Sequence, residues 1–234
     1  MKTKLLAAVS VFVSLVGICL VGPSAAQTYD WSGLYTGINA GGSWGNTGAR
    51  YAIVGARISG LNPESVIVGG HLGYNVQSDF LFVGLETDMA WRHGTAKQLF
   101  QHANLVDFAS HEVEQNWVGT FRPRFGFAIN QLLLYGTAGL AYGNLEHKFT
   151  EFRPGVAGRS KSKSEIDAGW TVGGGIEYGF TSKWTAGLEY LYMSFGDTKL
   201  SFPAQTINAL LFPASSSTFN DTSHVVRAKV TYRF

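Results

Sequence analysis

The chain has 234 residues, and its 18 lysines and arginines nearly balance its 16 aspartates and glutamates. A nucleic-acid-binding protein would carry a basic excess on one face, so this balance argues against that class. The single cysteine, Cys19, lies in the apolar segment that opens the chain, so we expect neither a disulfide nor thiol chemistry in the mature protein.

The first 26 residues have the pattern of a cleavable signal peptide. Lys2 and Lys4 provide a basic start, residues 5–21 form an apolar run, and small residues follow at the expected cleavage point. A membrane anchor helix is the alternative, but a Gly-Pro pair ends the apolar run early. The sequence therefore predicts a signal peptide over residues 1–26 and one exported domain over residues 27–234.

Eight later segments alternate apolar and polar residues, which predicts strands with two different faces. In the last of them, Arg227, Lys229 and Arg233 share one face while the opposite face is wholly apolar. Each segment has about the 9–11 residues that a tilted membrane strand needs, and no later apolar run approaches the roughly 20 of a membrane helix. The expected strands span 34–44, 66–77, 80–91, 117–127, 132–145, 166–180, 183–193 and 226–234.

The connections between these strands alternate in length. Short turns are expected at 78–79, 128–131 and 181–182, and long loops at 45–65, 92–116, 146–165 and 194–223. Short turns on one side and long extracellular loops on the other are typical of outer-membrane barrels. A closed barrel is also the structure, other than a helix, that satisfies its backbone in lipid. We therefore predict an all-β fold, an eight-stranded antiparallel transmembrane β-barrel.

The six tryptophans fit two aromatic girdles. Trp31 and Trp184 are expected at the turn side, and Trp44, Trp91, Trp117 and Trp170 at or near the loop side. One residue departs from the pattern, since Pro123 lies within the fourth strand and removes a ladder hydrogen bond that a closed barrel has no edge to hide. We expect a bulge at Pro123, unless the register of that strand is different.

Several motifs together resemble the small OmpA-like barrels, and most of all the α-proteobacterial surface-antigen porins. They are WSGLYTGINAGG at 31–42, GGHLGYNVQ at 69–77, VGLETD at 83–88, RPRFG at 122–126, LYGTAGLAYG at 134–143 and the terminal Phe234. The resemblance implies an eight-stranded barrel in the outer membrane of a Gram-negative bacterium. Members of this family are mostly abundant structural surface proteins, and some bind haem. The family usually has a small residue where Pro123 stands.

The inward positions of the predicted strands collect charges of both signs. They are Glu86, Asp88, Arg122, Arg124, Glu177, Glu189, Arg227 and Lys229. The lumen of an eight-stranded barrel is just wide enough for side chains to fill, and buried charges must pair. Neighbouring strands allow Glu86 and Asp88 to reach Arg122 and Arg124. We expect a structural network of ion pairs, with a narrow ion path as the alternative.

The loops offer a second candidate site. His93, His102, His111 and His147 fall on the loop side, where clustered imidazoles could bind haem iron. Each of them can equally be a solvated loop residue. No nucleophile motif such as G-x-S-x-G and no H-E-x-x-H accompanies them, so we expect no enzyme and no metal site.

The sequence thus predicts a structural role, that of a surface protein that supports the envelope and displays its loops. Haem or small-ligand binding by the loops and a low-conductance pore are the alternatives, and no cofactor is expected outside the haem hypothesis. Expected partners are outer-membrane lipid and lipopolysaccharide, the barrel-assembly machinery through the strand ending at Phe234, and a host or ligand contact through the loops, where the 194–223 connection is rich in apolar residues.

Overall fold

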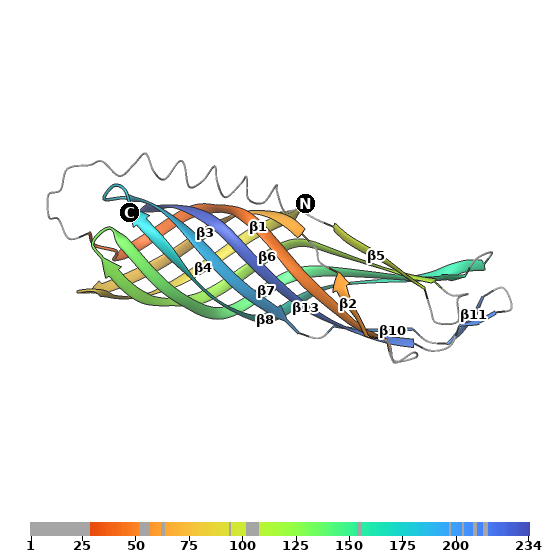
Figure 1. Ribbon diagram of the computed structural model, residues 1–234. Coiled ribbons are helices and arrows are strands. Elements are labelled where there is room, and N and C mark those ends of the chain that lie inside the picture. The colour runs from red at the N-terminus through yellow and green to blue at the C-terminus, as the bar shows by residue number, and fades with distance from the viewer. Residues whose placement is uncertain are drawn as a thin grey trace.

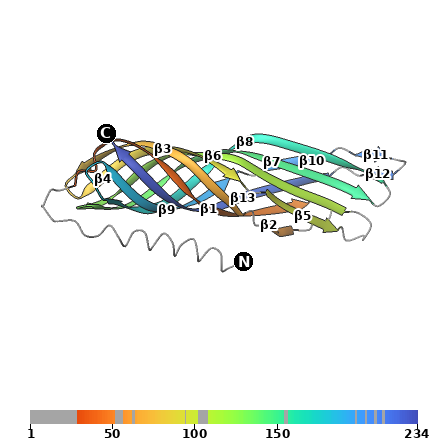
Figure 2. The ribbon, with the colours of Figure 1, turned by 90° about the horizontal axis from the view of Figure 1, so that it is seen from above.

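The computed structural model describes residues 29–234, apart from 52–56, 62–63, 94, 102–107, 154–155, 197, 203, 208–209 and 213–214. Eight long antiparallel strands close into a barrel, which confirms the predicted fold (Figures 1 and 2). They are β1 (Gly33–Tyr51), β3 (Glu64–Ser78), β4 (Leu81–His93), β6 (Phe108–Ile129), β7 (Leu132–Arg153), β8 (Val156–Gly179), β9 (Trp184–Phe195) and β13 (Ser215–Arg233).

The first and last of these strands close the barrel. β1 pairs with β3 on one side and with β13 on the other, and the β1–β13 register runs from Tyr35 opposite Arg233 to Tyr51 opposite Ser217. At the turn end, the Phe234 N–H also donates to the Leu34 carbonyl. This closure leaves the barrel without a free sheet edge, so its backbone groups are paired within the protein.

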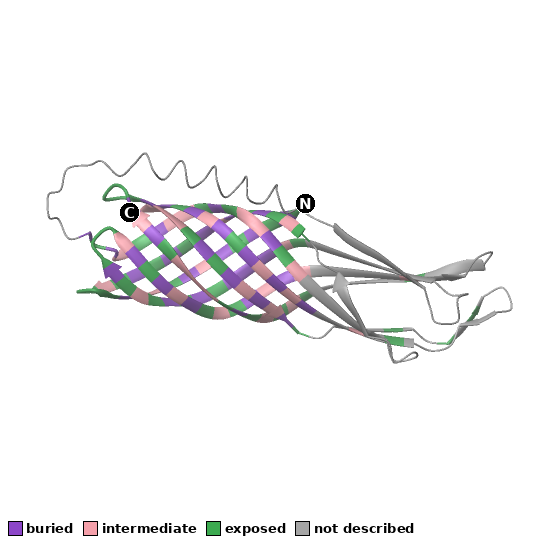
Figure 3. Cartoon of the chain, viewed as in Figure 1, coloured by how far each residue is buried: buried purple, intermediate pink, exposed green. Residues whose placement is uncertain are grey.

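The two faces of the strands differ as the alternation predicts. Along β3 and β4, buried and exposed residues alternate almost without interruption, and Figure 3 shows the resulting chequered surface over the barrel wall. Large apolar side chains such as Leu72, Val83, Phe125 and Leu140 point outward and are exposed. Such a band suits lipid rather than water. No helix in the described part of the chain is long and apolar enough to span a membrane.

The predicted long loops are largely strand in the described residues, and this part of the sequence prediction was wrong. Strands β7 and β8 continue as one hairpin to Arg153 and Val156, across most of the expected 146–165 loop. Short strands extend the wall further: β2 (Arg57–Leu61) pairs with β1, β5 (Thr95–Gln101) with β6, and β10 (Thr198–Phe202) with β13, while β11 (Gln205–Ile207) pairs with β12 (Leu210–Phe212). A hairpin that is already paired can continue beyond the lipid, where alternation of apolar residues is no longer required.

Pro123 sits in its strand without a bulge, contrary to the prediction. It faces outward, lies opposite Leu85 of β4, and leaves the register of β6 and β7 unchanged from Phe121 to Arg124. Its carbonyl accepts a hydrogen bond of 2.8 Å from the Thr137 hydroxyl. The strand therefore tolerates the missing N–H in place, and the register shift in β6 lies instead between Gln115 and Trp117.

Trp31 also differs from its expected place in a lipid-facing girdle. Its side chain is only 1% exposed, and its indole N–H donates to the Asn130 carbonyl at the β6–β7 turn. Its ring lies 4.8 Å from that of Tyr29, and the Arg233 guanidinium lies over both rings. The segment before β1 thus folds across the turn-side mouth, where an indole finds both apolar cover and a carbonyl acceptor.

Candidate functional site

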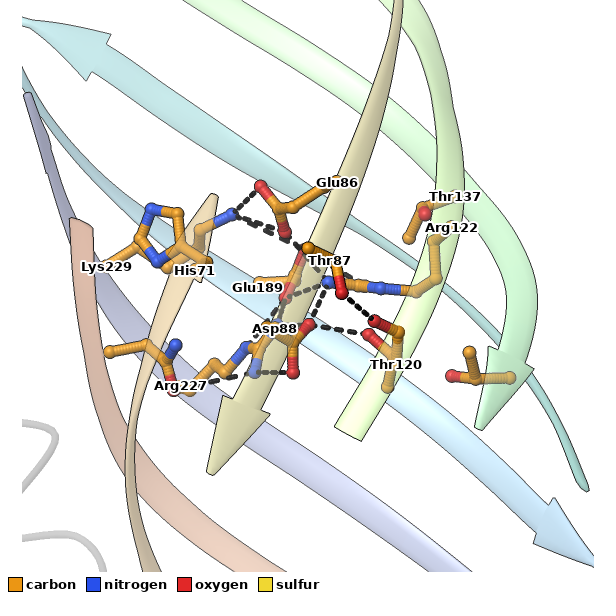
Figure 4. Close-up of polar contacts among 12 residues, drawn as sticks. His71, Glu86, Thr87, Asp88, Thr120, Arg122, Thr137, Glu189, Arg227 and Lys229 are labelled. Carbon is orange, nitrogen blue, oxygen red and sulfur yellow. Dashed lines mark hydrogen bonds and ion pairs between the residues drawn. The ribbon is translucent and has the colours of Figure 1, made fainter. Parts of the chain in front are cut away.

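The lumen brings the eight predicted charged side chains together. Two come from β4 (Glu86, Asp88), two from β6 (Arg122, Arg124), one each from β8 (Glu177) and β9 (Glu189), and two from β13 (Arg227, Lys229). All eight are buried. Alternate residues of a strand face opposite sides, and each of these eight positions falls on the side that faces the lumen. Figure 4 shows six of them converging from the surrounding strands.

Arg122 lies at the centre of the network. Its guanidinium is 2.8 Å from Glu86, 2.8 Å from Asp88 and 3.3 Å from Glu189. Asp88 also accepts a hydrogen bond of 2.6 Å from the Thr120 hydroxyl. A guanidinium carries several donors in a fixed plane, so one arginine can hold carboxylates from two different strands.

The pairs formed by β13 reach across the lumen. Arg227 lies 2.8 Å from Asp88 and 2.6 Å from Glu189, and Lys229 lies 2.7 Å from Glu86. In the sheet order, β1 and β3 separate β13 from β4, so the contacts with Asp88 and Glu86 are not between neighbouring strands. The network therefore ties together strands that the backbone ladder does not join.

Two tyrosines complete the network in addition to the eight predicted charged residues. The Tyr35 hydroxyl lies 3.0 Å from Glu86 and 2.7 Å from Arg124, and the Tyr135 hydroxyl donates to Glu189 at 2.9 Å. The Arg124 guanidinium lies 3.9 Å from the centre of the Tyr135 ring, within range of a cation–π contact. Both tyrosines occupy positions of β1 and β7 that the alternation places on the lumen side, and this pattern in the sequence could have identified them as members of the network.

Apolar layers lie on both sides of the charge network. The loop-side layer consists of Ile67, Ala90, Val118, Ala141, Leu191, Met193, Phe195 and Val225. The turn-side layer consists of Tyr29, Trp31, Phe82, Ala128, Leu133 and Tyr135. The ion pairs are therefore shielded from water at both ends, which strengthens each of them and makes an unpaired charge costly.

The haem hypothesis for the four loop-side histidines stays untested, because the side chains of His102, His111 and His147 lie outside the described residues. His93 is exposed at the end of β4, and His102 lies outside the described residues. His111 lies opposite Phe149 and His147 opposite Val113, so these two are diagonal neighbours on β6 and β7, but their side chains lie outside the described part. Among the described residues, no group of three histidine, cysteine or acidic side chains could hold a metal ion.

His71 and His224 have different places from the haem candidates. His71 is buried in the lumen, where its Nε2 lies 2.9 Å from the Thr231 hydroxyl. His224 lies on the outward face of β13, and its ring stacks on Trp44 at 5.8 Å. The carboxylates of the lumen, for their part, are held by cations and hydroxyls and packed between apolar layers, an arrangement that fixes them rather than exposing them to a substrate.

Comparison with known proteins agrees with this architecture. The family model described as outer membrane protein beta-barrel domain matches residues 12–234. The 31 kDa outer-membrane immunogenic protein of Brucella melitensis is 33% identical, over 91% of this chain and 88% of the relative. The 22 kDa outer membrane protein of Rhizobium leguminosarum is 30% identical, over 70% of this chain and 64% of the relative.

Among solved structures, the outer membrane protein OprG of Pseudomonas aeruginosa has a TM-score of 0.49 and 14% identity, covering 89% of this chain and 99% of its own. The family match spans the whole barrel, and the relatives named above are outer-membrane proteins. The chain therefore belongs to the outer membrane β-barrel family and is a surface protein of the Gram-negative outer membrane.

Proposed function

We propose that this protein is a structural element of the outer membrane, which supports envelope integrity and displays its extended hairpins outside the cell. The observation that carries the proposal is the filled lumen, where four carboxylates and four cations are paired between two apolar layers. A barrel filled in this way is suited to rigidity rather than transport, since buried paired charges hold a unique packing when every partner is present.

The proposal includes the path by which the protein reaches its place. Residues 1–26 serve as a signal peptide that is removed on export, and residues 27–234 form the barrel. The β13 strand, with its outward apolar residues and terminal Phe234, is the segment offered to the barrel-assembly machinery. The turns then lie on the periplasmic side, and the extensions β2, β5, β10, β11 and β12 lie outside, in contact with lipopolysaccharide and the surroundings.

The first experiment tests integrity in cells. A strain lacking the protein is complemented with the wild type, with Glu86→Ala, or with the outward-facing control Leu85→Ala, and its sensitivity to detergent and to a chelator is measured. We expect the wild type and Leu85→Ala to restore resistance, and Glu86→Ala to restore it only partly. Equal sensitivity with and without the protein would contradict the integrity role.

The second experiment tests the display of the hairpins. A small tag inserted after Gly158, in the extended part of β8, is probed with an antibody on intact cells, beside a control tag in the β8–β9 turn at Ser182. We expect the first tag to be labelled on intact cells and the second only after the outer membrane is opened. The reverse pattern would overturn the proposed orientation.

A conducting pore is the alternative that the packing disfavours. A conducting path would have to cross the Arg122, Arg227 and Glu189 contacts and then the layer around Phe195. We expect the reconstituted barrel to give no stable channel currents in a planar bilayer. Haem binding by His93, His102, His111 and His147 stays a prediction, tested by a haem titration of the wild type beside a variant with all four changed to alanine.

A further inference from the structure

A cluster of aromatic rings surrounds His224 on the outward face of the barrel, near the loop end of the strands. In the register, Trp44 of β1 lies opposite His224 of β13, and His224 lies opposite Tyr192 of β9. Tyr190 and Trp170 extend the cluster along β9 and onto β8. We call these five residues the rim cluster. They cover four adjacent strands, all on the side of the wall that faces lipid.

The rings of the rim cluster hold the imidazole in a defined place. His224 stacks on Trp44 with a ring distance of 5.8 Å and an angle of 10°, and Tyr192 meets its edge at 5.2 Å. The Tyr190 hydroxyl lies 2.8 Å from Nδ1 of His224 and shares a hydrogen bond with it. Trp170 packs on Tyr192 at 5.4 Å. Three rings and one hydrogen bond thus hold the imidazole, and Trp170 supports one of those rings.

The hydrogen bond determines what the imidazole offers to its surroundings. When the Tyr190 hydroxyl donates to Nδ1, the ring proton lies on Nε2, which becomes a donor. Among the described residues, Nε2 of His224 has no hydrogen-bond partner. An aromatic girdle requires only apolar rings with polar tips, and an imidazole N–H adds a hydrogen-bond donor to that function.

The turn-side girdle has a different composition, which supports a specific role for the rim cluster. There Trp184 packs on Tyr232 at 5.1 Å, and Lys183 lies 3.3 Å from the Tyr232 hydroxyl. A lysine beside aromatic rings suits the phosphate of an ordinary phospholipid, as a flexible point charge. The rim cluster has instead an imidazole held among flat ring faces, which suits a ligand that combines phosphate with sugar rings.

We propose that the rim cluster binds the phosphorylated glucosamine head group of lipopolysaccharide. The exposed faces of Trp44 and Trp170 pack on the sugar rings, and the N–H of His224 donates to a phosphate oxygen. Tyr190 acts as a positioning residue, because its hydroxyl orients the imidazole. The inference rests on the proposed orientation, in which the loop end meets the outer leaflet that contains this glycolipid.

The test uses the mature barrel refolded in detergent and titrated with bisphosphorylated lipid A, with binding followed by thermophoresis. Wild type is compared with His224→Phe, which keeps a ring and removes both nitrogens, and with Tyr190→Phe. Trp91→Leu is the matched control, because Trp91 is an exposed loop-side tryptophan on β4, outside the cluster. Heat-dependent gel mobility verifies that each variant is folded.

We expect saturable binding by the wild type, and about tenfold or more weakening in His224→Phe, since a hydrogen bond to a charged oxygen is lost. Tyr190→Phe should weaken binding less, and Trp91→Leu should match the wild type. Lipid A without phosphates should bind the wild type as weakly as intact lipid A binds His224→Phe.

Three results would overturn the inference: unchanged binding by His224→Phe, an equal loss in Trp91→Leu, or equal competition by phosphatidylethanolamine, which would make the cluster a general interfacial belt. Failure here is distinct from failure of the proposed function. The titration in detergent does not depend on orientation or envelope integrity, and the tag at Gly158 tests orientation without lipid A.

Discussion

The two surfaces of this barrel wall differ in what holds them in place. Inside, the eight charges of the network have named partners, and Arg122 alone contacts Glu86, Asp88 and Glu189. Outside, residues such as Leu140 and Phe125 are exposed to a lipid that any apolar side chain would satisfy. The inner surface therefore requires particular residues, whereas the outer surface away from the rim cluster requires only a class of residue at a given depth.

The largest effect should come from breaking the inner surface at one carboxylate. Glu86→Ala leaves Lys229, Arg122 and Arg124 with an unmatched buried charge, so we expect a loss of about 3–5 kcal/mol in the free energy of unfolding. Urea unfolding in lipid vesicles, followed by tryptophan fluorescence, measures it. The adjacent lipid-facing change Leu85→Ala is the control, and a comparable loss in both variants would remove the distinction between the surfaces.

The outer surface should respond to depth rather than to partners. Leu72 and Val66 are both exposed, at 47% and 63%, but Leu72 lies near the middle of β3 and Val66 near its loop end. We expect Leu72→Arg to destabilise the barrel by about 2–4 kcal/mol and Val66→Arg by about 0–1 kcal/mol. Equal costs in the same vesicle assay would show that the outer surface is selective in a way that depth does not explain.

A double-mutant cycle measures how strongly the inner surface couples distant strands. Asp88 and Arg227 meet at 2.8 Å although β1 and β3 separate their strands. We expect Asp88→Ala and Arg227→Ala to cost less together than the sum of the single changes, with a coupling energy of about 0.5–3 kcal/mol. The pair Asp88→Ala and Trp184→Ala should be additive, and additivity of both pairs would refute coupling across the lumen.

The same contrast explains which parts of the fold the sequence could predict. The period of two identifies inward positions, so the eight strands and the placement of Glu86, Arg122 and Arg227 followed from local pattern. The local pattern does not predict which cation contacts which carboxylate, because contacts such as that of Lys229 with Glu86 depend on the width and closure of the barrel.

The other features that the sequence did not predict have physical causes of the same kind. The hairpin of β7 and β8 beyond the lipid has no apolar stripe, and backbone pairing alone extends it to Arg153 and Val156. Trp31 precedes the first strand, so no alternation fixes its direction, and it turns into the mouth to donate to Asn130. Phe195 of the loop-side apolar layer lies in the expected 194–223 loop, beyond the strand predicted over 183–193, so no alternation marked it as an inward residue.

The smallest effect is expected at Pro123, where an outward residue interferes with the backbone that both surfaces share. Pro123→Ala restores one N–H in β6, and a ladder hydrogen bond contributes about 0.5–1.5 kcal/mol. The same change releases the unfolded chain from a proline constraint, at a cost of about 0.4–1 kcal/mol. The two terms oppose each other, so we expect the free energy of unfolding to change by less than about 1 kcal/mol. Hydrogen exchange should distinguish the two effects. Slower exchange at the neighbouring Thr137 and Ala138 amides would report the restored hydrogen bond even when the free energy of unfolding does not change. A large gain in stability would mean instead that β6 is strained by the proline, although its register with β7 is the same at Phe121 and at Arg124.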